Sequence, residues 1–179
     1  MKNSSRPIKI KSYIFSRLDF DTFDLTDTAS TGACVDSFGV TVGSSRVYQS
    51  LCGTNSGEHV YLETGRATTA QKLTFTLGAT STVAQWRVKV SQIECSATWK
   101  APADCYQYYT GVSGSAQSFN YPSTLVDGLM YSICVRQETG FCAIEWSAAA
   151  TTIDSFHLST IAAPTVGLAV SFFPIFLEC

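Results

Sequence analysis

Apolar residues alternate with polar ones in several short runs of this 179-residue chain, and this period of two most constrains the fold. The clearest runs are residues 34–43, 72–77 and 86–90. Successive side chains of a β-strand point to opposite faces, so each run predicts a strand with one face in a core and one in water. No convincing apolar period of 3.6 residues precedes residue 96. The sequence therefore predicts an all-β protein.

The spacing of the apolar residues also predicts how some strands behave. Residues 13–25 carry two apolar pairs whose alternation is broken near Thr22, which predicts a half-buried strand with a kink there. We expect residues 72–77 and 86–90 to pair with each other as antiparallel strands. Residues 131–146 predict a hairpin, because two strand-like runs flank a glycine-containing turn.

Seven cysteines set the next constraint. None forms a Cys-x-x-Cys motif, and neither His59 nor His157 lies at ligand spacing from a cysteine, so disulfides are favoured over a metal site. Disulfides indicate a secretory or extracellular setting. Residues 1–19 contain no apolar signal-peptide region, and the odd cysteine count with a terminal Cys179 suggests a chain cut short. We expect a secreted protein; the alternative is a cytosolic protein with reduced thiols.

Composition excludes several function classes. A content of 45% hydrophobic and 15% charged residues favours a packed core over disorder, and a net charge of -2 without a Lys/Arg block argues against nucleic-acid binding. The chain contains neither Gly-x-Ser-x-Gly nor His-Glu-x-x-His, so we expect no enzyme. Residues 161–177 are uncharged, but their marginal length and two prolines favour buried strands or a loop over a membrane span.

A short proline-containing connector, residues 96–104, separates two predicted modules. Residues 13–95 look like the back part of a β domain whose front is shortened. Residues 105–179 look like the front part of another whose back is missing. A weak internal repeat supports this division, since residues 15–20 resemble residues 141–146.

Several short motifs, taken in order, resemble CUB domains, which are extracellular β-sandwich modules. These motifs are Phe20-Asp-Thr-Phe-Asp-Leu, Cys34-Val-Asp-Ser-Phe, Leu51-Cys-Gly and Ser118-Phe-Asn-Tyr-Pro. The order is similar to that of tandem CUB-like proteins of arthropods, and the resemblance covers residues 17–158. It implies secretion and an antiparallel β-sandwich of the jelly-roll type, here as two modules that both look incomplete. One alternative is a single permuted sandwich built from residues 105–158 and 34–93, or halves exchanged between chains.

Six cysteines are assigned to predicted disulfides: Cys34, Cys52, Cys95, Cys105, Cys134 and Cys142. The favoured pair is Cys34 with Cys52, which is also joined in the family. Short local spacings favour Cys95 with Cys105 across the connector and Cys134 with Cys142 across the hairpin. The rival scheme, implied by the family, pairs Cys105 with Cys134 and leaves Cys95 for Cys142. Sequence alone does not settle the connectivity.

The resemblance also implies a candidate calcium site, because some CUB domains bind calcium through acidic residues. Asp21, Asp24 and Asp36 are the weak candidates, since carboxylates supply the hard oxygen ligands that calcium prefers. Residues 78–85, where the family usually adds another acidic ligand, contain none. The alternative is solvated loop carboxylates, and no other cofactor is expected.

The most notable aromatic cluster consists of Trp99, Tyr106, Tyr108 and Tyr109. Large rigid rings with a polar tip suit an interface, and packing between the modules is an equal alternative. Asn3 starts an Asn-Ser-Ser acceptor for glycosylation if that segment is secreted; an ordinary exposed start is the alternative.

Together these observations predict a noncatalytic secreted module that acts through protein–protein association in an extracellular assembly. Its expected partners are other extracellular proteins or copies of itself. The alternatives are the regulatory or recruiting part of a larger extracellular protease, and a carbohydrate-binding module that uses the Trp/Tyr cluster.

Overall fold

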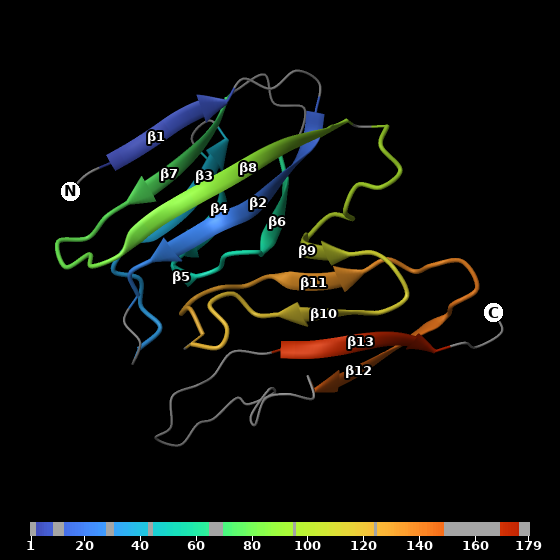
Figure 1. Ribbon diagram of the computed structural model, residues 1–179. Helices are drawn as coiled ribbons and strands as arrows, with labels where there is room; N and C mark the ends of the chain where they lie inside the picture. The colour runs from blue at the N-terminus through green and yellow to red at the C-terminus, as the bar shows by residue number, and fades with distance from the viewer. Residues whose placement is uncertain are drawn as a thin grey trace.

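The computed structural model describes residues 3–8, 13–27, 31–42, 45–64, 70–94, 96–123, 125–148 and 169–175. Within these ranges the chain forms thirteen strands and no helix (Figure 1). The predicted all-β class is confirmed. Among the same residues, no helix is long and apolar enough to cross a membrane.

The first sheet has the order β1-β7-β3-β4 and is antiparallel throughout. Its strands are β1 (Asn3–Ile8), β3 (Ser37–Val42), β4 (Ser45–Leu51) and β7 (Gln71–Thr76). Buried and less buried residues alternate along β3 and β7, because one face of the sheet packs on the core. The predicted glycosylation acceptor Asn3 is the first residue of β1, so its backbone is paired with β7.

The second sheet is built around the long strand β2 (Tyr13–Leu25). On one side of β2 lie β5 (Gly53–Thr54) and β6 (His59–Glu63), and on the other lies β8 (Ala84–Glu94), all antiparallel. The expected pairing of residues 72–77 with 86–90 is wrong, because β7 and β8 belong to different sheets. They meet through the core instead, where the rings of Phe75 and Trp86 stack at 4.3 Å.

A bulge in β2 lies at the kink predicted near Thr22. Phe20 and Thr22 both have partners on β8, whereas Asp21 between them has none. One extra residue in a strand resets the alternation of its side chains. Phe20 and Phe23 therefore both point into the core, although they are three residues apart.

One hydrophobic cluster fills the space between the two sheets. The rings of Phe20, Phe23 and Phe38 are 4.6 to 5.8 Å apart between centroids, and all three are buried. Phe119 and Val126, which follow the connector in the sequence, belong to the same cluster. Residues from both sides of the connector thus share one core, as a single sandwich would require. The predicted division into two modules stays a prediction.

The strands after the connector pair in an order that sequence spacing did not predict. They are β9 (Cys105–Tyr109), β10 (Gly114–Gln117), β11 (Ser132–Val135), β12 (Ala143–Ala148) and β13 (Ala169–Ile175). β11 pairs with β9 in parallel, and β13 lies between β10 and β12 (Figure 1). The predicted strands and the turn between them exist, but the hairpin is wrong because β11 and β12 have other partners. Within the uncharged tail, residues 169–175 form a strand.

Candidate functional site

Two disulfides fix the strands on either side of the connector. Cys34 bonds Cys52, as the sequence favoured, with Cα atoms 5.6 Å apart. Cys105 bonds Cys134, with Cα atoms 5.7 Å apart. This bond joins the parallel neighbours β9 and β11.

The preferred local scheme of Cys95 with Cys105 and Cys134 with Cys142 is therefore wrong, and Cys105–Cys134 is the pair of the rival scheme. The physical reason is that no hairpin brings β11 beside β12, so Cys134 meets β9 instead. Cys142 is also disulfide-bonded. The predictions on Cys95 and Cys179 fall outside the described residues.

A buried polar cluster joins β6 and its preceding turn to β9. The side-chain amide of Gln107 donates to Glu58 Oε2 at 2.9 Å, and the Tyr108 backbone N–H donates to His59 Nε2 at 3.1 Å. Burial raises the pKa of the Glu58 carboxyl. Burial, helped by the charge of Arg17, lowers the pKa of His59 to about 4. At neutral pH His59 is thus uncharged, and its Nε2 lies 3.1 Å from both the backbone nitrogen and the carbonyl oxygen of Tyr108.

Asn120 forms a second link between the segments on either side of the connector. Its backbone N–H donates to Asn55 Oδ1 at 2.7 Å, its side-chain Nδ2 donates to Asp27 at 2.6 Å, and its Oδ1 accepts from the Thr54 N–H at 2.9 Å. A Cβ on Gly53 would clash with this Oδ1. Gly53 also has φ +77°, a conformation that side-chain-bearing residues rarely adopt. Only glycine leaves room for the Asn120 amide.

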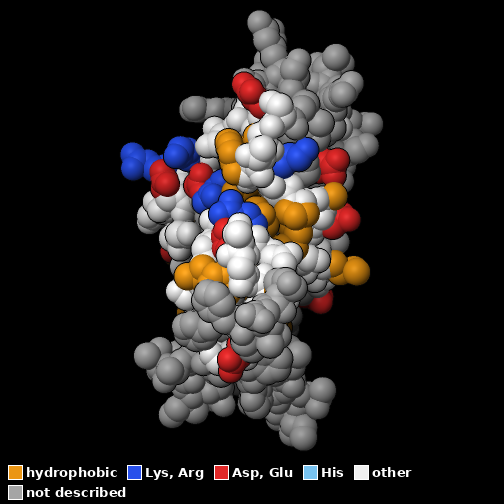
Figure 2. All heavy atoms as spheres, turned by 90° about the vertical axis from the view of Figure 1, so that its right-hand side faces the viewer, with side chains coloured by type: hydrophobic (Ala, Val, Ile, Leu, Met, Phe, Trp, Pro, Cys, Tyr) orange, Lys and Arg blue, Asp and Glu red, His pale blue; other side chains and the backbone are white. Residues whose placement is uncertain are grey.

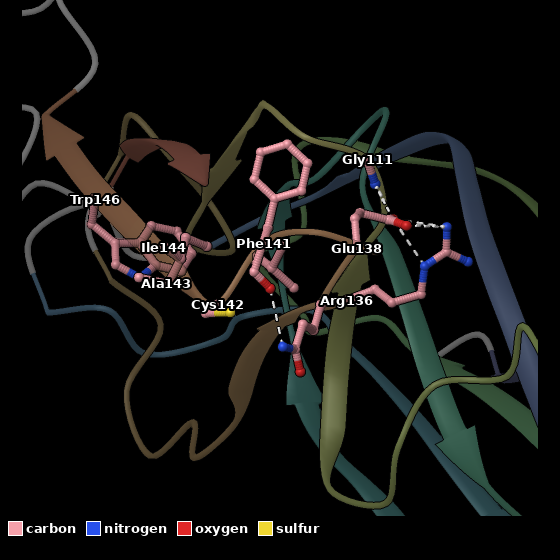
Figure 3. A pocket seen from close by; sticks show the side chains of 10 residues that line it. Gly111, Arg136, Glu138, Phe141, Cys142, Ala143, Ile144 and Trp146 are labelled. Atoms are coloured by element: carbon pink, nitrogen blue, oxygen red, sulfur yellow. Dashed lines mark hydrogen bonds and ion pairs between the residues drawn. The ribbon is translucent and has the colours of Figure 1, made fainter. Parts of the chain in front are cut away.

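The first surface hollow, which we call the Trp146 pocket, has a volume of about 290 Å³ and lies where β11 turns toward β12 (Figure 3). Phe141, Ile144 and Trp146 form its apolar side. Ile144 and Trp146 are 38% and 43% exposed, which is high for such large apolar side chains on a strand. They lie two residues apart on β12 and therefore share one face of it.

The opposite side of the Trp146 pocket is charged but internally neutralised. Arg136 forms two hydrogen bonds with the carboxylate of Glu138, at 2.9 and 3.0 Å, and the Gly111 N–H donates to Glu138 at 2.7 Å (Figure 3). The hydrogen bond from Gly111, followed by Arg136, lowers the pKa of Glu138. The pair holds the turn after β11 in place and adds little net charge to the pocket.

The second hollow, which we call the Trp99 pocket, has a volume of about 520 Å³. It lies on the outer face of β2 and β8 and is lined by charged, polar and aromatic side chains, chief among them Arg17, Asp19, Asp21, Lys89, Ser91 and Trp99. Figure 2 shows the face that is on the right in Figure 1, where Lys and Arg side chains lie among hydrophobic and acidic ones. This mixture forms no block of a single charge.

The three aspartates proposed for calcium do not fit such a site. Burial opposes ionisation of Asp36, but hydrogen bonds from Gly78, Ser81 and Thr26 outweigh it and lower its pKa. Both of its oxygens are thereby occupied by neutral donors, at 2.8 to 2.9 Å. Asp24 accepts a hydrogen bond from the Thr54 hydroxyl, and Asp21 lies in the bulge. No group of three or more potential metal ligands exists among the described residues.

The predicted aromatic cluster divides between the core and the surface. Tyr108 is 8% exposed and packs in a small cluster with Tyr61, and Tyr106 packs against the main core. The ring of Tyr109 meets that of His59 edge-on at 5.1 Å. Trp99 is 52% exposed and remains the candidate best placed for binding.

Comparison with known proteins gives one family match and a structural match. Residues 102–171 match the family described as the animal CUB domain. A solved structure, the CUB1-EGF-CUB2 domain of human MASP-1/3, is similar at 12% sequence identity with a TM-score of 0.40, covering 97% of this chain and 93% of that chain. No curated protein matches the chain. The tandem arrangement and the arthropod type stay predictions.

Sequence reasoning did not single out Trp146, Ile144 or Glu58 as site residues. The alternation of residues 143–146 was the available signal, because it placed Ile144 and Trp146 on one face. It could not tell which face of β12 is open to water. Nothing in the local sequence marks Glu58 as a buried carboxyl, since its burial comes from β9.

Proposed function

We propose that this chain is a noncatalytic, secreted interaction module that acts through protein–protein association. The match of residues 102–171 to the animal CUB domain supports this, because CUB domains are generally extracellular protein-interaction modules. The two disulfides that join described residues suit an oxidising compartment.

The exposed apolar side of the Trp146 pocket is the observation that carries the proposal. Trp146 is a large, rigid side chain of the kind that dominates binding energy at interfaces. The ion pair of Arg136 with Glu138 lies on the opposite side of the pocket and gives it a polar margin. A pocket of about 290 Å³ suits a single apolar side chain from a partner protein rather than a large ligand.

The test compares the protein with its Trp146→Ser and Trp99→Ser variants. Sedimentation velocity measures self-association, and the biotinylated protein captures partners from extracellular fluid of the source tissue for identification by mass spectrometry. We expect at least one association, with a copy or another extracellular protein, that Trp146→Ser weakens tenfold or more. Trp99→Ser should leave this association intact, since Trp99 lies in the other pocket. Association that is absent, or equal in all three proteins, would contradict the proposal.

A further inference from the structure

The Trp99 pocket has no assigned role, and three of its polar side chains have no partner within the described part of the chain. Among the described residues, the side chains of Asp21, Lys89 and Ser91 make no hydrogen bond or ion pair. They supply an acceptor, a donor and a hydroxyl that can do either. A ligand in this pocket would therefore meet unpaired polar groups of both kinds.

The bulge in β2 explains why a carboxylate reaches this pocket. Asp21 is the extra residue of the bulge and has no partner on β8. Bulges commonly redirect a side chain near functional sites. The Gly57 N–H bonds the Phe20 carbonyl at 2.7 Å and the Phe20 N–H bonds the Glu58 carbonyl at 2.9 Å, so the backbone before the bulge is held on its other edge. Asp21 thus projects from a fixed backbone.

A second polar group of the pocket is held in place by its neighbours. Arg17 Nε donates to Asp19 at 2.7 Å, and Arg17 also donates to the Tyr61 hydroxyl at 3.0 Å. Its guanidinium carbon lies 5.3 Å from the centre of the Tyr61 ring. These contacts fix the guanidinium and the Asp19 carboxylate in position before any ligand arrives. Such order lowers the entropy lost on binding.

Trp99 supplies an aromatic surface beside these polar groups. Its side chain is 52% exposed, although the connector in which it lies is anchored by Ala101, which is fully buried. The tryptophan is therefore presented from a fixed backbone and not from a loose loop. An exposed indole offers an apolar face together with an N–H donor.

The mixed character of the pocket decides the class of ligand. Arg17 and Lys89 balance Asp19 and Asp21. Glu58 also lines the pocket, but its residue is only 9% exposed and its carboxylate accepts a hydrogen bond from Gln107 of β9. Neither a strongly anionic nor a strongly cationic ligand is therefore favoured. A pyranose ring carries C–H groups on its faces and hydroxyls, each both donor and acceptor, around its rim. The ring faces match Trp99, and the rim matches the carboxylates, the ammonium and the hydroxyl of the pocket. We propose that the Trp99 pocket binds a pyranose unit of a neutral glycan.

The probes are a printed array of neutral and sulfated glycans, followed by titration of the best neutral oligosaccharide with calorimetry. We expect binding to at least one neutral glycan, weakened at least tenfold in Trp99→Ala and in Asp21→Ala. Both side chains are exposed, so both variants should fold, which circular dichroism checks. Val112→Ala is the control, because Val112 is 51% exposed, much like Trp99, and lines neither pocket; it should bind the glycan as the wild type does.

Three outcomes would overturn the inference. The first is no binding to any neutral glycan on the array. The second is binding that Trp99→Ala leaves unchanged. The third is binding limited to sulfated glycans and lost at high salt, which would indicate charge attraction alone. Each leaves the association through Trp146 unaffected, so failure of this inference is distinct from failure of the proposed function.

Discussion

Acidification from pH 7 to pH 5 should weaken the fold by about 2 kcal/mol through His59 alone. The side chain is 7% exposed, and burial, followed by the charge of Arg17, lowers its pKa from 6.5 to about 4. The His59 ring of the unfolded chain therefore becomes protonated below about pH 6.5, whereas that of the folded chain becomes protonated only near pH 4. A depressed folded-state pKa contributes stability that is fully present above the unfolded value and lost as the pH falls.

Glu58 acts in the opposite direction, so His59 must be isolated by comparison. Burial raises the pKa of Glu58, and a raised folded-state pKa gives stability at low pH that is lost as the pH rises. His59→Gln keeps an acceptor for the Tyr108 N–H but does not titrate, while Glu58 is present in both proteins. Urea unfolding at pH 7 and pH 5, with disulfides intact, should show that the wild type loses about 2 kcal/mol more than His59→Gln.

The reasoning fails if the two proteins lose equal stability over this range. An independent check follows the His59 ring by NMR, with its signal assigned by its absence in His59→Gln. The signal of the folded protein should titrate near pH 4. Titration near 6.5 would show that the ring is not held neutral by its surroundings.

Two further predictions concern the links between the segments on either side of the connector. Gly53→Ala should lower the free energy of unfolding by about 2 to 4 kcal/mol, because it combines an unfavourable φ with a clash against Asn120. Gly57→Ala is the control, because its φ is also positive but the space around it is open, and it should cost only about 1 to 2 kcal/mol in the same urea unfolding assay. Equal losses in the two variants would contradict the clash. Replacing Cys105 and Cys134 together by serine should lower the free energy of unfolding by about 3 to 4 kcal/mol, and an unchanged urea midpoint would show that the bond does not constrain the unfolded chain.

Local spacing in the sequence predicted where strands form better than it predicted which strands pair with each other. The alternation along residues 34–43 and the break near Thr22 follow from side-chain direction, which is a local property. The partner of β11 is a long-range property. Residues near Thr139 predict a turn and hence a hairpin of β11 with β12. Instead β11 pairs in parallel with β9, to which the Cys105–Cys134 disulfide joins it.

Of the residues that line the two pockets, the sequence singled out Trp99 as an interface candidate. Trp99 was predicted together with three tyrosines as one aromatic cluster. Only the structure shows that Trp99 is exposed and Tyr108 is buried, because both are aromatic residues near the connector and the sequence does not give their exposure. Glu58 and His59 are adjacent, and their buried state depends on β9, which begins more than forty residues later. No local pattern contains that information.

Gly53 and Asn120 have a consequence for how such sequences diverge. The Asn120 amide occupies the volume that a Gly53 side chain would need, and the same amide bonds the neighbouring Thr54 backbone. A side chain added at position 53 therefore meets two costs, the positive φ and the clash with Asn120, and a smaller residue at position 120 relieves only the second. The two positions should covary in homologous sequences, so an alignment alone could reveal that the segments before and after the connector have been inherited as one unit.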